Sequence, residues 1–289
     1  MDKASKQKRH ALRNLIIQRA PKREAIHLAL RDGTVIKLRN CLTYKPAKLR
    51  QEAAYRVYWQ KKHYGIIKLF YPKSQHLLDA LVLNELYGYT LAKRAKLYIP
   101  QILDMGPLDD YDAYYVLYQY LPHQHFCFSD GNLQKLIDVQ KKMFAANLVQ
   151  YDNHVRNYLL TPKGTAIVDF ATIQTYDSTR YSLKIKQYIA SVRMLSQALH
   201  HISNSQTKKI TCQHYLGQLH GLSYQSKAIV TLTLSTTYLV TKLRNISQIL
   251  NRKWPNTLLT SIMTVVTREC HTKLCQLAFA ICFLIKKHH

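Results

Sequence analysis

The feature that most constrains this chain is the stretch at residues 147–174, NLVQYDNHVRNYLLTPKGTAIVDFATIQ. Within it, Asp152 is followed five positions later by Asn157, and two strand-like runs around a Pro-Lys-Gly turn lead to Asp169 and Phe170. Phosphoryl transfer uses one carboxylate near the attacking hydroxyl. It also uses an amide oxygen and a second carboxylate on the metal that binds the nucleotide phosphates. The stretch therefore predicts one half of a phosphotransferase site.

The other half of such a site needs a lysine for the nucleotide phosphates and an acid that holds this lysine. Lys68 lies inside the apolar, strand-like run at residues 65–71, where a lysine is rarely buried unless it is paired. The acid that fits is Glu85, which follows Asp79 on a predicted helix and lies on the inward side of that helix. We therefore expect Lys68 and Glu85 to form an ion pair.

A nucleotide site also needs backbone groups that contact the adenine. The run YVLYQYL at residues 115–121, stopped by Pro122, predicts a strand that passes into a linker. We expect the nucleotide to contact the end of this run, which consists of Tyr118, Gln119, Tyr120 and Leu121.

Turn signals and hydrophobic periodicity predict an α+β fold, with antiparallel strands and one main helix in the first half and mostly helices in the second half. The strands are expected at residues 24–40 (a hairpin around Arg31-Asp32-Gly33), 53–59, 64–71, 101–106 and 113–121, and the first helix, with Ser74 as its N-cap, at 74–96. After them, helices are expected at residues 130–149 and 183–202, and in segments around 213–250 and 255–285.

These elements, taken in order, resemble the protein-kinase-like fold over residues 53–176. The matching motifs are GIIK with Lys68, the helix acid Glu85, YDNHVRN with Asp152 and Asn157, and VDF with Asp169. Within that fold the chain is most similar to the bacterial lipopolysaccharide core kinases, which phosphorylate heptose or Kdo. The resemblance implies a bilobal protein, with a basic arm at 1–23, an N-lobe at 24–121 and a C-lobe at 122–289 whose residues 205–289 form a basic helical part.

The resemblance also implies the chemistry: ATP and Mg²⁺ as cofactors, and transfer of the γ-phosphoryl group to a hydroxyl of an inner-core sugar. Asp152 would be the catalytic base, and Asn157 and Asp169 would hold Mg²⁺. Lys68 would contact the nucleotide phosphates and be fixed by Glu85. No covalent intermediate is needed, because this chemistry consists mostly of positioning and charge neutralisation.

Several positions depart from the protein-kinase pattern. Tyr151 precedes Asp152, and His154 stands two positions after it with Arg156 close by, so His154 or Arg156 could contact the transferred phosphate or an anionic acceptor. Ala171 follows Asp169-Phe170 where a glycine is usual. Residues 41–52 contain no glycine, so a glycine-rich loop cannot cover the nucleotide there, and basic side chains such as Lys45 or Lys48 would have to replace it. No Ala-Pro-Glu motif follows Asp169. These departures favour a glycolipid or small-molecule kinase.

The formal net charge of +26 is unevenly distributed. Residues 1–50 hold 14 Lys and Arg against 3 acids, and residues 178–289 hold 15 against 1, whereas residues 51–177 hold 13 against 12. Such basic flanks favour an anionic partner. We expect an anionic membrane surface and the lipopolysaccharide core as partners, and we do not expect nucleic acid, because no nucleic-acid-binding module is recognisable.

The six cysteines form neither a dense disulfide framework nor a CxxC zinc pattern, which is typical of reduced thiols in a cytosolic protein. The N-terminal residues lack the apolar core of a secretory signal. The apolar run at 274–285 is too short to span a bilayer and fits either a core helix or an interfacial anchor. Together with the resemblance, this predicts a cytoplasmic protein that is peripheral on the inner face of the inner membrane.

Two alternatives remain open at this point, and the oligomeric state is not predicted. The chain could be a protein kinase or another small-molecule kinase with the same site, although the missing glycine-rich loop counts against a protein kinase. It could also be a pseudokinase that serves as a cationic adaptor for a membrane or nucleic acid. The joint presence of all five key residue types argues against this second alternative.

Overall fold

The computed structural model describes residues 7–8, 11–12, 14–16, 26–41, 52–59, 62–72, 74–175, 181–200, 202 and 204–220. Helices and strands are both present, which confirms the predicted α+β class. The chain divides into two compact units, a first unit of Met1–Gln124 with Leu159–Thr172 and a second unit of His125–Tyr158 with Ile173–His289.

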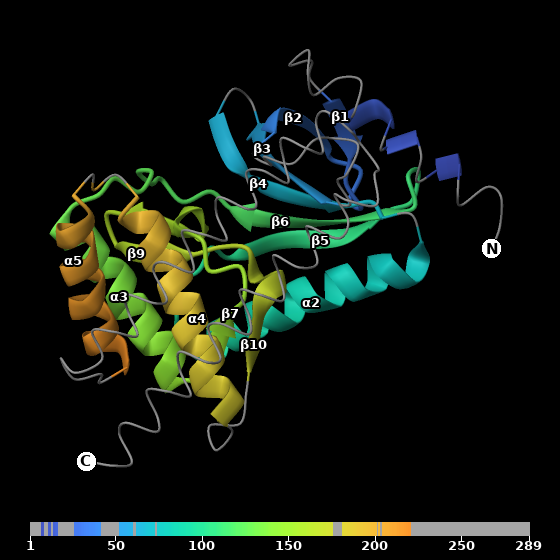
Figure 1. Ribbon diagram of the computed structural model, residues 1–289. Coiled ribbons are helices and arrows are strands. Elements are labelled where there is room, and N and C mark those ends of the chain that lie inside the picture. Colours follow the sequence, from blue (N-terminus) through green and yellow to red (C-terminus); the bar gives the residue numbers. More distant parts are fainter. Residues whose placement is uncertain are drawn as a thin grey trace, which may run out of the picture. The chain divides into compact units, whose positions relative to one another are not determined.

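The first unit is built on a six-stranded antiparallel sheet with the strand order β1-β2-β3-β4-β6-β5 (Figure 1). The predicted hairpin around Arg31-Asp32-Gly33 and the other predicted strands of this unit are present, and β4 begins two residues earlier than expected. The strands are β1 (Ile26–Ala29), β2 (Val35–Cys41), β3 (Glu52–Trp59), β4 (Lys62–Phe70), β5 (Ile102–Leu108) and β6 (Ala113–Gln119).

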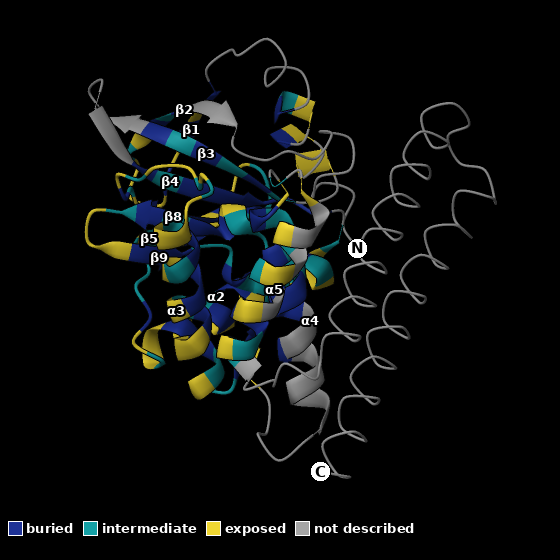
Figure 2. Cartoon of the chain, turned by 60° about the vertical axis from the view of Figure 1, so that its left-hand side comes forward, coloured by how far each residue is buried: buried dark blue, intermediate teal, exposed yellow. Residues whose placement is uncertain are grey.

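The two faces of this sheet differ in chemistry because successive side chains along a strand point to opposite faces. One face carries apolar side chains such as Ile67 and Leu117, which are buried in the main core. Figure 2 shows buried residues in dark blue along the strands of this sheet. Leu12 and Ile16, from the helical N-terminal residues, are fully buried in the same core. The described part of the predicted arm is therefore helical and part of this core. Lys68 lies on the other face.

Helix α2 (Gln75–Arg94) confirms the first predicted helix and its cap, because the Ser74 side chain accepts a hydrogen bond from the backbone N–H of Leu77. The buried residues of α2 are Leu78, Val82, Glu85, Gly88 and Ala92, so Glu85 lies on the inward side, as predicted. Gly88 and Ala92 carry little hydrophobic signal, so the sequence pattern did not mark them as buried.

The predicted strand pair around Pro162-Lys163 is confirmed by β8 (Tyr158–Thr161) and β9 (Gly164–Ile167). The short 3-10 helix η3 (Phe170–Thr172) follows and packs against α2 within the first unit. A backbone hydrogen bond from Ile167 N–H to the Tyr98 carbonyl, 2.9 Å long, ties β9 to the segment after α2. The stretch with Asp169 thus belongs to the same unit as Lys68.

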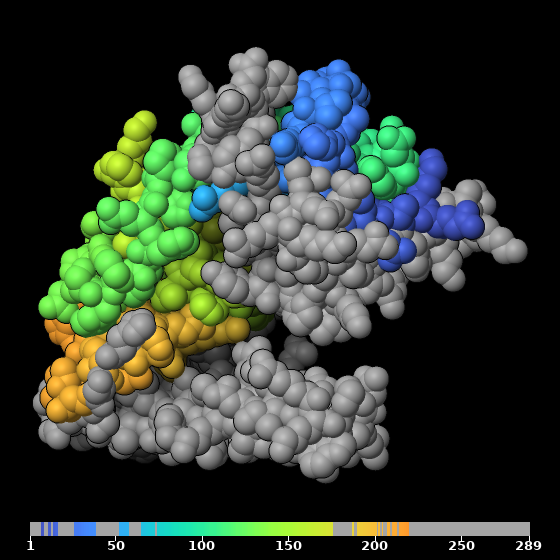
Figure 3. Space-filling model, turned by 90° about the horizontal axis from the view of Figure 1, so that it is seen from above, coloured from blue at the N-terminus to red at the C-terminus, as the bar shows by residue number. Residues whose placement is uncertain are grey.

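The second unit packs α3 (Asp130–Ala145), α4 (Tyr181–Ala198) and α5 (Ser205–His220) against one another, and the orange atoms in Figure 3 belong to α4 and α5. The predicted extension of α3 to residue 149 is wrong. Asn147 has a φ of 56°, a left-handed conformation that ends helices. The chain then enters β7 (Leu148–Gln150), which pairs with β10 (Ile173–Thr175), a pair that was not predicted.

Several predicted features lie outside the described residues. They include the segments beyond residue 220, the apolar run at 274–285, and the lysines Lys45 and Lys48. Among the helices that the structure describes, none is both long enough and apolar enough to cross a membrane.

Candidate functional site

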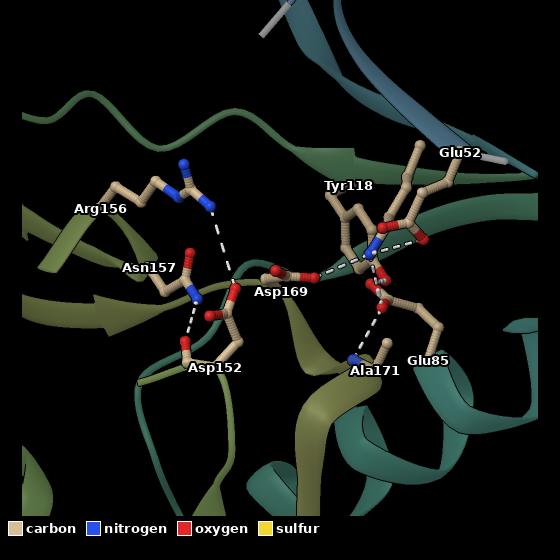
Figure 4. A network of polar contacts seen from close by, with 9 residues as sticks. Glu52, Glu85, Tyr118, Asp152, Arg156, Asn157, Asp169 and Ala171 are labelled. Carbon is tan, nitrogen blue, oxygen red and sulfur yellow. Dashed lines mark hydrogen bonds and ion pairs between the residues drawn. The ribbon is translucent and has the colours of Figure 1, made fainter. Parts of the chain in front are cut away.

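Lys68 is the centre of the candidate site in the first unit. Its ammonium lies 2.9 Å from Glu85 Oε2, so the predicted ion pair is present. Asp169 Oδ1 also lies 2.9 Å away, and Glu52 Oε2 lies 3.6 Å away. Figure 4 shows these three carboxylates turned toward one ammonium group. Lys68 and Asp169, which are 101 positions apart in the sequence, are therefore in direct contact in the folded protein.

The surroundings of Lys68 keep it charged. Burial alone would lower the pKa of the Lys68 ammonium, but Glu85, Asp169 and Glu52 outweigh it and raise this pKa well above 10.5. The ring of Phe70, two residues along β4, adds a cation–π contact at 5.5 Å. The amine thus presents a permanent positive charge of the kind that binds phosphate.

Glu85 is only 1% exposed, and every contact of its carboxylate is with a donor. Oε1 accepts a hydrogen bond of 2.7 Å from the Tyr118 hydroxyl, and Oε2 accepts one of 2.9 Å from the Ala171 N–H. Burial and the neighbouring Glu85 raise the pKa of Tyr118, so its hydroxyl remains a donor. Glu85 is thus a structural junction of β4, α2, β6 and η3. No sequence motif indicated that Tyr118 and Ala171 donate hydrogen bonds to Glu85.

Asp169 adopts an unusual backbone conformation, with a φ of 66°. Such a conformation costs a non-glycine residue on the order of 1–3 kcal/mol and persists where its surroundings enforce it. Here the next residue, Phe170, is 1% exposed and packs edge-on to Tyr89 at 5.2 Å and tilted to Tyr118 at 5.8 Å. The Asp169 side chain remains 34% exposed. The buried ring anchors the segment while the carboxylate stays accessible.

The predicted adenine linker is shorter than expected. Tyr118 and Gln119 still belong to β6, and the Gln119 N–H donates to the Gln101 carbonyl at 2.8 Å. Beyond the strand, the Leu121 carbonyl contacts His123 Nδ1 at 2.7 Å. The Gln119 N–H is therefore hydrogen-bonded to the backbone of Gln101, and the Tyr118 hydroxyl is hydrogen-bonded to Glu85. The linker proper begins at Tyr120.

In the second unit, Asn157 is the last residue of the loop at residues 151–157, and this loop sets the position of its side chain. It is 4% exposed, and its side-chain Nδ2 donates to the Asp152 carbonyl at 2.8 Å (Figure 4). This bond fixes the orientation of the amide and leaves its oxygen as the atom for a metal. The 3-10 helix η2 (Val155–Asn157) carries the residue, with His154 as its N-cap.

The loop at residues 151–157 is tied to α4 by three hydrogen bonds that the sequence did not reveal. Asn153 Nδ2 donates to the Ala190 carbonyl at 2.9 Å, and Gln197 Oε1 accepts from the Val155 N–H at 3.1 Å. Arg193 Nη1 donates to the Tyr151 carbonyl at 3.2 Å. The partners on α4 lie about 40 residues away in sequence, so no local motif marks them.

Asp152 carries two guanidinium neighbours within this unit. Arg193 Nη2 lies 2.9 Å from its Oδ1, and Arg156 Nη2 lies 3.9 Å from its Oδ2. The Asp152 side chain remains 30% exposed. His154 Nδ1 accepts a hydrogen bond from the Arg156 backbone N–H at 3.4 Å, as the cap of η2. Arg156 and Arg193 are thus two cations that lie beside this carboxylate.

Mg²⁺ binds oxygen, and in phosphate sites it takes one or two protein ligands and completes its shell with water and phosphate. Within the first unit, the carboxylate of Asp169 is a ligand of this kind. Within the second unit, the side-chain oxygen of Asn157 is another. Within the part of the chain that is described, His, Cys, Asp and Glu form no cluster of three that could hold a metal.

No protein-family model matches this chain, and no curated protein matches it. The assignment of a function therefore depends on the residues and their geometry.

Proposed function

We propose that the protein is an ATP-dependent kinase that transfers the γ-phosphoryl group to a hydroxyl of a lipopolysaccharide inner-core sugar, heptose or Kdo. The observation that carries the proposal is the contact of the Lys68 ammonium with both Glu85 and Asp169 at 2.9 Å. This arrangement joins a strand lysine, a helix acid and the acid of an Asp-Phe pair, as a phosphoryl-transfer site requires.

The roles follow from the chemistry of each group. Lys68 binds the nucleotide phosphates, and Glu85 holds its ammonium in place. Asp169 and Asn157 are the residues that would hold Mg²⁺, which when bound supplies neutralisation of the developing charge. Asp152 orients the acceptor hydroxyl and accepts its proton. Tyr120 and Leu121 remain as linker contacts to the adenine.

The acceptor and the location rest on the sequence resemblance and on charge. The strongly basic flanks of the chain fit a phosphorylated glycolipid and the anionic lipid surface in which it lies. We therefore place the protein on the cytoplasmic side of the inner membrane, as a peripheral protein.

An acceptor comparison tests this proposal. The purified protein is incubated with Mg-ATP and either dephosphorylated core lipopolysaccharide or a generic protein, with Asp169→Ala as the inactive control. We expect transfer to the glycolipid, and only by the wild type. Transfer to protein alone would replace the glycolipid kinase by a protein kinase. Absence of transfer to either, without a nucleotide-induced rise in Tm, would favour the pseudokinase adaptor.

A further inference from the structure

We propose that Tyr158 and Asn153 are positioning residues, whose hydrogen bond closes the loop at residues 151–157 and sets the placement of Asp152 relative to Asn157. Both act through their neighbours in the chain rather than on the substrate. The inference rests on the proposed kinase function and deepens it, because it names the residues that hold the base and the metal ligand of the second unit in one geometry.

The loop is closed by two side-chain hydrogen bonds that lie one residue apart in the sequence. In the first, Asn157 Nδ2 donates to the Asp152 carbonyl at 2.8 Å (Figure 4). In the second, the Tyr158 hydroxyl donates to Asn153 Oδ1. Asn153 directly follows Asp152, and Tyr158 directly follows Asn157. The second bond therefore connects the chain neighbours of the two functional residues.

Both partners of the Tyr158–Asn153 bond are anchored in the interior of the second unit. Asn153 is 1% exposed and Tyr158 is 2% exposed. Asn153 Nδ2 donates to the Ala190 carbonyl on α4 at 2.9 Å. The Tyr158 hydroxyl oxygen accepts a hydrogen bond of 3.3 Å from Gln140 Nε2 on α3. The bond that closes the loop is thus connected to a helix at each of its two ends.

The Tyr158 hydroxyl suits this role because it remains protonated. Burial raises the pKa of Tyr158 above its ordinary value. The hydroxyl can therefore donate to Asn153 and accept from Gln140 at every pH at which a kinase works. A phenylalanine would fill the same space, but it would leave Asn153 Oδ1 and Gln140 Nε2 without this partner, and unsatisfied buried polar groups are costly.

A role in stability alone explains this placement less well. The buried network also extends away from the loop, where Ser191 Oγ lies 3.2 Å from Gln140 Oε1. The contact from Tyr158 to Asn153 is the branch that reaches the loop. Catalytic groups must be held within about 0.5 Å of their productive geometry by the hydrogen bonds behind them. A misplacement of about 1 Å can lower the rate about 10²-fold.

Hydrogen–deuterium exchange of the full chain tests the inference without any assay of activity. Tyr158→Phe removes the bond to Asn153, whereas Gln140→Met, the matched control, breaks the same buried network and keeps that bond. We expect the amides of residues 151–157 to exchange about tenfold faster in Tyr158→Phe and at the wild-type rate in Gln140→Met. A role in stability alone would raise the exchange of this loop equally in both variants, which would overturn the inference.

Kinetics of phosphoryl transfer supply the second measurement. We expect Tyr158→Phe to lower kcat about tenfold or more, while the KM for ATP stays close to the wild-type value. The Mg²⁺ concentration that gives half the maximal rate should rise, because the Asn157 amide is displaced. Gln140→Met should match the wild type in all three quantities. Faster loop exchange in Tyr158→Phe without a fall in kcat, or an equal fall in both variants, would overturn the inference.

Two further outcomes are distinguishable. If Tyr158→Phe does not fold, Asn153→Ala removes the same bond from the acceptor side and is compared with Gln140→Met in the same two measurements. Failure of the proposed function shows in a different signal, the absence of phosphoryl transfer by the wild type. Faster loop exchange in Tyr158→Phe would then still support the closure of the loop by Tyr158, while the absence of transfer would contradict the kinase.

Discussion

Replacing Lys68 by methionine removes the ammonium group that lies 2.9 Å from Glu85, and the structure allows the loss of stability to be estimated. Breaking a fully buried ion pair costs roughly 3–5 kcal/mol, because it leaves an uncompensated charge. Glu85 would keep its hydrogen bonds from Tyr118 and Ala171, which offsets part of this loss. We therefore expect the free energy of unfolding to fall by about 2–4 kcal/mol.

The pH dependence of this deficit has a definite sign. Because the folded-state pKa of Lys68 is raised, its stabilisation is fully present below the unfolded pKa of about 10.4 and is lost only as the pH rises through the higher folded value. The deficit of Lys68→Met relative to wild type should therefore stay constant between about pH 7.5 and pH 9.5.

Urea unfolding followed by far-UV circular dichroism measures both quantities. Lys93→Met is the control, since Lys93 is exposed in the last turn of α2 and should change stability by only a few tenths of a kcal/mol. A deficit for Lys68→Met no larger than that of Lys93→Met, or one that shrinks as the pH rises toward 9.5, would refute the reasoning.

Two further predictions concern packing and thiol chemistry. A methyl group added at Gly65 would collide with the backbone carbonyl of Tyr118, so Gly65→Ala should lower the free energy of unfolding by about 1–3 kcal/mol. Gly131→Ala meets no atom within 4 Å in α3 and should be neutral or stabilise by up to about 1 kcal/mol, as urea unfolding will show. Burial raises the pKa of Cys212 to about 12, whereas Cys127 is exposed. Iodoacetamide at pH 8, read by peptide mass spectrometry, should therefore alkylate Cys127 before Cys212 in the folded protein, and equal rates would contradict the burial.

Much of the first unit was predictable because its signals are local. Alternating side chains and tight turns marked the hairpins, and Ser74 marked the start of α2. The ion pair of Lys68 with Glu85 was predictable because a lysine inside an apolar strand requires an acid, and the next helix offered one on its inward side. Asp169 followed from its spacing to Asp152.

The remainder depended on contacts between distant segments. Nothing near Asp152 in the sequence points to Arg193, since the loop meets α4 only after folding. The sequence places Tyr118 in a linker, whereas the residue lies within β6 and its hydroxyl donates to Glu85. The end of α3 was missed because Asn147 fits a helix by pattern until its left-handed φ is known.

The most direct test of the central claim is the transfer of radiolabelled γ-phosphate from Mg-ATP to dephosphorylated core lipopolysaccharide. Wild type is compared with Asp152→Asn, which keeps the shape of the side chain but not its charge. The account predicts incorporation by the wild type, a fall of about 10²-fold or more in Asp152→Asn, and an unchanged Mg-ATP-induced rise in Tm. Equal incorporation by both proteins, or none by the wild type, would contradict it.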